Sequence, residues 1–108
     1  MITLTVFTRA GAPVGFEVRG HEESRVCSFV SGIVDFVGKG VTQNIPDIST
    51  ADVQNDPHAR GDAISVRVVL TDADASRPIP QALLETLRSQ APVMAAQGLI
   101  AFAERDIG

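Results

Sequence analysis

The chain of 108 residues contains a single cysteine, Cys27. One thiol cannot form an internal disulfide, so it stays free, and a reducing compartment is the simplest setting for it. The chain also starts directly in a strand-like pattern, without the basic segment and apolar core that are typical of a secretion signal. These two absences together predict a cytoplasmic protein.

Aromatic and basic side chains are also scarce. The sequence has no Trp and no Tyr, and 13 acidic residues outnumber 9 basic ones, for a net charge of -4. Proteins that bind DNA or RNA usually present a basic stripe, and single-strand binders add aromatic stacking platforms. We therefore expect no direct binding of nucleic acid, and a surface better suited to a basic protein partner.

Long apolar runs are missing as well. No stretch approaches the roughly 20 apolar residues that a membrane-spanning helix needs, so no membrane partner is expected. A hydrophobic content of 44% is enough to build a core without disulfides or metal at this length. Residues 1–108 are therefore expected to form one domain.

Two pairs of strands are indicated by apolar residues that alternate with other residues. Residues 2–8 and 13–20 show this period of two on either side of a Gly- and Pro-containing turn, which predicts an antiparallel hairpin. Residues 48–54 and 63–71 predict a second hairpin. The polar content of 48–54 indicates that this strand lies at a sheet edge.

The period changes to that of a helix after Ser24, which is the expected N-cap. Six apolar residues then share one stripe, and Gly38 or Gly40 is the expected stop, so a helix is predicted near 26–38. Cys27 lies beside the stripe, where we expect the thiol to be partly exposed at the edge of the helix–sheet contact. The stripe consists of Val26, Phe29, Val30, Ile33, Val34 and Val37.

A second helix is predicted over residues 78–104. Pro78 or Pro80 suits its first turn, and Pro92 is expected to kink it or divide it in two. The resulting order, ββαββα, packs most simply as a two-layer α+β fold, in which a four-stranded antiparallel sheet is covered on one face by two helices.

The residues with the most reactive side chains gather between the second strand and the first helix. His21 follows the strand and lies six residues before Cys27. The positive end of the helix dipole favours a thiolate near a helix N-terminus, and an imidazole within reach can take the thiol proton. The pair therefore indicates a nucleophile and its base. A buried inert thiol and a solvated histidine are the alternative that the sequence leaves open.

Ser24 and Ser31 are candidate supporting residues of this site. Ser31 lies one helical turn beyond Cys27, where its hydroxyl can bond within the site or back to a carbonyl of its own helix. A zinc site built from Cys27, His21, His58 and a carboxylate is not expected, because the chain lacks paired ligand spacing. No cofactor is expected either.

Several short motifs occur in the order found in one protein family. They are Met1-Ile2-Thr3, Gly15-Phe16, Gly20-His21, Val26-Cys27 and Ser31. In these motifs, and in the order of its predicted strands and helices, the chain resembles the ribosomal-processing cysteine protease (Prp) family. The His-to-Cys loop is shorter here than in that family, and Ser24 stands where the family motif has Asp.

The resemblance implies that Cys27 is the nucleophile and His21 the general base of a cysteine endopeptidase with a two-layer α+β fold. It implies removal of a short N-terminal extension from a large-subunit ribosomal protein, by cleavage after aromatic residues, during ribosome maturation. The alternative left open is a catalytically inactive homologue that binds a basic ribosomal or other protein through its acidic surface.

The resemblance also implies a homodimer. A physical argument points the same way. The end of the predicted second helix carries apolar residues on more than one face, and one side of a single sheet cannot easily cover all of them. These residues are Val93, Met94, Leu99, Ile100 and Phe102.

Overall fold

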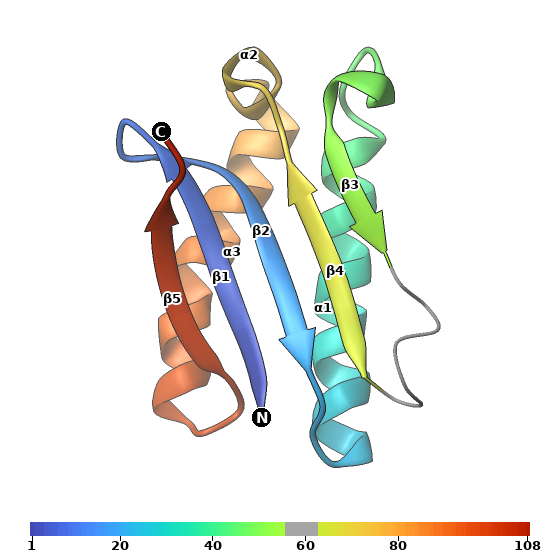
Figure 1. The fold of residues 1–108 in the computed structure, drawn as a ribbon, viewed down its shortest axis with the longest axis vertical. Helices are drawn as coiled ribbons and strands as arrows, with labels where there is room; N and C mark the ends of the chain where they lie inside the picture. The colour runs from blue at the N-terminus through green and yellow to red at the C-terminus, as the bar shows by residue number, and fades with distance from the viewer. Residues whose placement is uncertain (56–62) are drawn as a thin grey trace.

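The computed structural model describes residues 1–55 and 63–108, and its elements form two layers, a sheet and a set of helices on one face of it (Figure 1). The predicted two-layer α+β class is confirmed. The strands are β1 (Ile2–Arg9), β2 (Ala12–Gly20), β3 (Asp52–Asn55), β4 (Ile64–Val69) and β5 (Ala101–Asp106). The helices are α1 (Ser24–Thr42), the 3-10 helix η1 (Ile48–Thr50), α2 (Asp72–Ala75) and α3 (Pro78–Ala96).

The strands lie in the order β3-β4-β2-β1-β5. The two predicted hairpins are confirmed, since β1 pairs antiparallel with β2 and β3 pairs antiparallel with β4. β2 and β4 join the hairpins, also antiparallel, with Gly20 opposite Ile64. β3 lies at the predicted edge, and all four of its residues are exposed.

The prediction of a strand over 48–54 is wrong for its first half, because residues 48–50 form η1 instead. The Asp47 carboxylate accepts hydrogen bonds from the Ser49 backbone N–H at 2.9 Å and from its hydroxyl at 2.7 Å. These hydrogen bonds, led by that of the hydroxyl, lower the pKa of Asp47. Such a local bond competes with strand pairing, so β3 begins only at Asp52.

The sheet has a fifth strand where the sequence predicted the end of a helix. α3 stops at Ala96, and β5 pairs parallel with β1. The stop is a Schellman motif: Gly98 has φ +77°, its N–H donates to the Ala95 carbonyl, and the Leu99 N–H donates to the Met94 carbonyl. The sheet is therefore mixed, not wholly antiparallel.

Part of the apolar excess predicted for one helix lies in or directly before β5. Ile100 is buried and Phe102 is partly buried at the β5 end of the sheet. α3 runs through Pro92 as one helix, so the predicted division is absent. Buried Leu87, Ala91 and Met94 on both sides of the proline hold α3 against the sheet.

α1 is longer than predicted and differs at both ends. Ser24 is its first helical residue and not its N-cap, which is Glu23. The helix passes both predicted stop glycines, and a Cβ at Gly40 would collide with the Leu83 side chain, so this glycine permits close packing of α1 on α3. The residues that α1 buries are Cys27, Val30, Val34, Val37 and Val41.

The face of α1 that is buried in the core includes only part of the predicted apolar stripe. Val30, Val34 and Val37 are buried as predicted, but Phe29 is 52% exposed. Figure 1 shows α1 behind β3 and β4, and α3 behind the other half of the sheet. Across residues 1–55 and 63–108, no helix has the length and apolar character to span a membrane.

Candidate functional site

The end of β2 is shaped by Gly20, whose φ is +130°. A Cβ at this position would collide with the Met1 carbonyl, so only glycine lets the chain leave β2 at this point. The Met1 amino group donates a hydrogen bond of 2.6 Å to the His21 carbonyl. Gly20 and Met1 together fix the backbone from which the segment His21–Glu23 leads into α1.

The thiol of Cys27 lies under that segment. Its Sγ accepts a hydrogen bond from the Glu22 N–H at 3.2 Å and donates one to the Glu22 carbonyl at 3.1 Å. Cys27 is only 6% exposed, so the expectation of a partly exposed thiol is wrong. The reason is the rotation of α1, which places Cys27 on the same face as Val30 and Val34.

The His21 side chain is exposed, and no hydrogen bond joins its imidazole to the thiol in the part of the chain that the structure describes. His21 thus begins the short segment His21–Glu23, Cys27 lies in the first turn of α1 after it, and the backbone of Glu22 lies against the sulfur.

The first turn of α1 offers backbone donors near the thiol. No side chain among the described residues caps this turn, and the Cys27 N–H already donates to the Glu23 carbonyl at 3.0 Å. The N–H groups of Ser24, Arg25 and Val26 precede it and have no partner within the helix, as in any α-helix. They are suited to binding a negative oxygen. The Ser24 side chain is exposed and does not act as the predicted cap.

A metal site is not supported by the described residues, among which no three His, Cys, Asp or Glu side chains form a cluster that could hold an ion. His58, which the sequence offered as a possible third ligand, lies outside the described residues.

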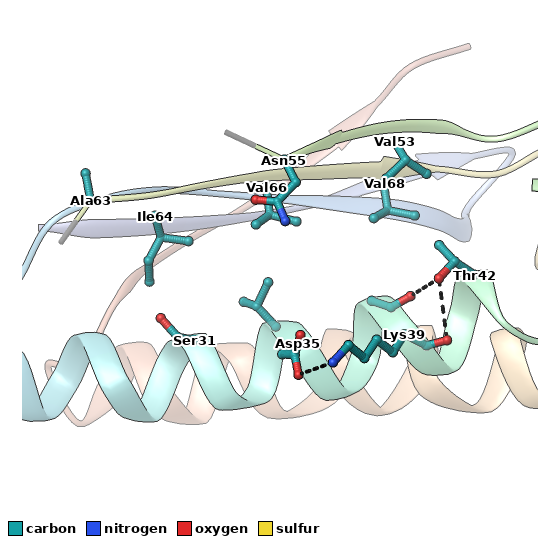
Figure 2. Close-up of a pocket in the computed structure, with 12 residues that line it drawn as sticks. Ser31, Asp35, Lys39, Thr42, Val53, Asn55, Ala63, Ile64, Val66 and Val68 are labelled. Atoms are coloured by element: carbon teal, nitrogen blue, oxygen red, sulfur yellow. Dashed lines mark hydrogen bonds and ion pairs between the residues drawn. The ribbon is translucent and has the colours of Figure 1, made fainter. Parts of the chain in front are cut away.

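A groove that sequence reasoning missed runs along α1 on its β3 and β4 side. We call it the sheet-side groove; its volume is about 500 Å³, and Ser31 lies at one end of it (Figure 2). α1 supplies polar side chains to the groove and the strands supply mostly apolar ones. Its lining includes Ser31, Asp35, Val53, Asn55, Ile64 and Val66.

A second groove lies on the opposite flank of α1, against α3. This helix-side groove has a volume of about 650 Å³ and is mostly apolar. Two of its lining residues, Phe29 and Phe36, are 52% and 71% exposed. Its lining also includes Ser28, Ile33, Leu83, Leu87 and Met94.

Comparison with known proteins finds similarity in structure but none in sequence profiles or curated sequences. No protein-family profile and no curated protein sequence matches the chain. Solved structures do match. The essential ribosomal processing protease Prp from S. aureus, in complex with a covalently linked product peptide, is 18% identical, with 96% of this chain and 99% of that one covered and a TM-score of 0.69.

Two further structures match over a similar length. SMU.848 from Streptococcus mutans is 17% identical with a TM-score of 0.68 and 98% of both chains covered. A hypothetical protein from Staphylococcus aureus is 15% identical with a TM-score of 0.67 and covers 96% of this chain and 99% of its own. The predicted resemblance is thereby confirmed at the level of structure: nearly the whole chain has the fold of the ribosomal processing protease Prp.

Proposed function

We propose that this protein is a cysteine endopeptidase that removes an N-terminal extension from a large-subunit ribosomal protein, with Cys27 as nucleophile and His21 as general base. One observation carries the proposal. In a chain that has the fold of a ribosomal processing protease, the single cysteine lies in the first turn of α1, and His21 directly follows β2, which ends at Gly20. The proposed setting is the cytoplasm.

In the proposed reaction, the His21 imidazole takes the proton of the Cys27 thiol, and the thiolate attacks the carbonyl carbon of the peptide bond. The oxygen of the tetrahedral intermediate accepts hydrogen bonds from N–H groups at the start of α1. The intermediate then collapses to a thioester, and the amine leaves with the proton from His21. Water, deprotonated by His21, releases the new carboxylate and restores the thiol.

The reaction needs an opening step, because the Glu22 backbone covers the sulfur in the resting structure. Two hydrogen bonds to a thiol are weak, and each contributes about 1 kcal/mol or less to holding the segment closed. Two further contacts of the segment are exposed: the hydrogen bond from the Met1 amino group to the His21 carbonyl, and the 3.8 Å approach of that amino group to the Glu22 carboxylate. Substrate binding can therefore move His21–Glu23 at small cost.

The test is cleavage of a synthetic peptide copied from the N-terminal extension of the ribosomal protein of the same organism. The parent protein should cleave it, and Cys27→Ala and His21→Ala should not, while both variants keep the circular dichroism spectrum of the parent. Cys27→Ser should bind the peptide without turnover. Equal cleavage by Cys27→Ala, or no cleavage by the parent, would sink the proposal.

A second candidate is a catalytically inactive homologue that binds a basic ribosomal or other protein. The buried thiol, satisfied by the Glu22 backbone, favours this candidate, because such a thiol is inert until the loop opens. Labelling by a thiol-reactive probe across pH separates the two. Fast labelling of the folded protein near pH 7 supports the peptidase, whereas labelling only under denaturing conditions supports the binding protein.

The proposed active form is a homodimer whose interface is the helix-side groove. Phe29 and Phe36 are two helical turns apart on one face of α1, and both are largely exposed. Two large aromatic rings on one face of a helix are rarely both exposed in a monomer. A second copy related by a two-fold axis can cover them with its own α1. A sedimentation experiment that finds only monomer at micromolar concentration would contradict the dimer.

A further inference from the structure

We propose that the sheet-side groove is the site in which the substrate is held, and that it binds an extended peptide segment with an apolar side chain about seven residues from the cleaved bond. This inference rests on the proposed function, because it names the surface that presents the peptide bond to Cys27. The alternative site, the helix-side groove, lies on the other flank of α1.

Two separate features of the fold place one end of this groove at the candidate catalytic pair. Ile64, at that end of the groove, is the strand partner of Gly20, the residue before His21. Ser31, at the same end in Figure 2, lies one helical turn beyond Cys27 on the same face of α1. A peptide that leaves the groove at this end therefore arrives between His21 and Cys27.

The lining of the groove suits an apolar side chain on a hydrogen-bonding backbone. Val53 and Val66 project from β3 and β4 toward α1 (Figure 2). The helical rim carries Asp35 and Lys39, whose charged groups pair with each other at 3.1 Å and leave no net charge on this rim. Apolar strand residues beside a neutral polar rim favour an apolar side chain over a charged one.

The edge strand beside the groove can bind the peptide backbone. β3 lies at the end of the sheet that the described residues form, and all four of its residues are exposed, so one side of its backbone pairs with no other described strand. An extended peptide added there would direct alternate side chains toward α1. Val53 is 44% exposed on this edge, where an uncovered valine is otherwise a hazard for aggregation.

The length of the groove sets the size of the segment it holds. Ser31 and Thr42, which both line it, are 11 residues apart on α1, which corresponds to about 16 Å of helix. An extended peptide covers this distance with about five residues. Cys27 precedes Thr42 by 15 residues of α1, or about 22 Å, and Val53 lies near the Thr42 end in Figure 2, so its peptide contact is placed about seven residues from the cleaved bond.

The experiment compares Val53→Asp with Val93→Asp. Both valines are exposed to a similar degree, 44% and 48%, and Val93 lies on α3 outside both grooves. The substrate is the extension peptide, together with a series in which each apolar residue in turn is replaced by serine. Binding of the same peptides is measured by fluorescence polarisation in a Cys27→Ala background, where no cleavage interferes.

We expect Val53→Asp to raise KM and the peptide Kd about tenfold or more, because its carboxylate faces the apolar side chain of the substrate. Val93→Asp should match the parent. The effect of Val53→Asp should vanish for the one serine peptide that lacks the contacting side chain, as in a double-mutant cycle.

The outcomes separate the two proposals. If the parent cleaves the peptide and Val53→Asp behaves like Val93→Asp, the groove proposal is wrong and the peptidase proposal stands. If the parent never cleaves but the peptide binds and Val53→Asp alone weakens binding, the groove proposal stands as a peptide site and the peptidase proposal fails. If Val53→Asp weakens the binding of every serine peptide as much as that of the unchanged peptide, the contact with an apolar side chain is refuted.

Discussion

The two flanks of α1 differ in the side chains that they expose. The sheet-side groove combines valines of β3 and β4 with Ser31, Asp35 and Lys39 of the helix. The helix-side groove lies between α1 and α3 and exposes the rings of Phe29 and Phe36. One flank can bond to a peptide backbone at a strand edge, and the other offers only apolar area. The first suits a transient extended ligand and the second a lasting protein interface.

Both flanks come from one helix because successive residues turn by 100° around its axis. Val34 and Ser31 face the strands, whereas Ile33 and Phe36 face α3. A substitution on one flank should therefore leave the function of the other unchanged. The four predictions below test this independence, from the largest expected effect to the smallest.

The largest effect is expected for Cys27→Ala, which should lower kcat/KM by at least about a thousandfold while leaving the oligomeric state unchanged. In the proposed mechanism the thiol forms the covalent intermediate, and Cys27 does not line the helix-side groove. Steady-state kinetics and sedimentation measure the two effects. If the Cys27→Ala variant still cleaves the peptide, or if it becomes monomeric, the two flanks of α1 do not act independently as proposed.

Val34→Asp should lower the free energy of unfolding by about 3 to 5 kcal/mol, because it places an unpaired charge in the core. Val34 is only 5% exposed. The matched control is Phe36→Asp, two residues away and 71% exposed, which should leave the stability of the monomer nearly unchanged. Urea unfolding of both variants decides; equal losses would show that burial does not distinguish the two positions.

Phe36→Asp should instead weaken the dimer. Loss of a large ring from the centre of an interface costs about 2 kcal/mol, or roughly a 30-fold increase in the dimer Kd. Val53→Asp, on the other flank, serves as the control and should leave the dimer Kd at the parent value. Analytical ultracentrifugation over a concentration series measures both. A dimer that tolerates Phe36→Asp does not use the helix-side groove.

The smallest effect is expected for Ser31→Ala, which should raise KM for the extension peptide about three- to fivefold through the loss of one neutral hydrogen bond. Ser28→Ala is the matched control, since Ser28 is an exposed serine of the same helix that lines the other groove. KM for the parent and the two variants is measured side by side. A larger effect of Ser28→Ala would reverse the assignment of the flanks.

One further contact sets the position of α3 and lies apart from both grooves. The Arg88 guanidinium donates to the Glu104 carboxylate at 2.7 Å and to the Gly11 carbonyl at 2.9 Å, so it links α3 to β5 and to the β1–β2 turn. The hydrogen bond to Glu104 raises the pKa of Arg88 above its usual value. These bonds help to hold the fifth strand that the sequence did not predict.

The sequence by itself determined the local elements. Alternation of apolar residues predicted β1, β2 and β4, and the helical period predicted most of α1, because both patterns are set by the backbone geometry of a short segment. Proximity in the chain also placed His21 just before α1 and Cys27 in the first turn of that helix. Gly98 could have signalled the end of α3, since a glycine after the last helical turn is a frequent stop.

Only the tertiary structure decided the parallel pairing of β5 with β1, since that pairing joins residues almost 100 positions apart and leaves no local period. It also decided that Cys27 is buried under Glu22, because the rotation of α1 depends on what the sheet and α3 offer it. The two grooves have the same origin. Each is formed by side chains from elements that meet only in the folded chain, so their shape follows from packing and not from sequence pattern.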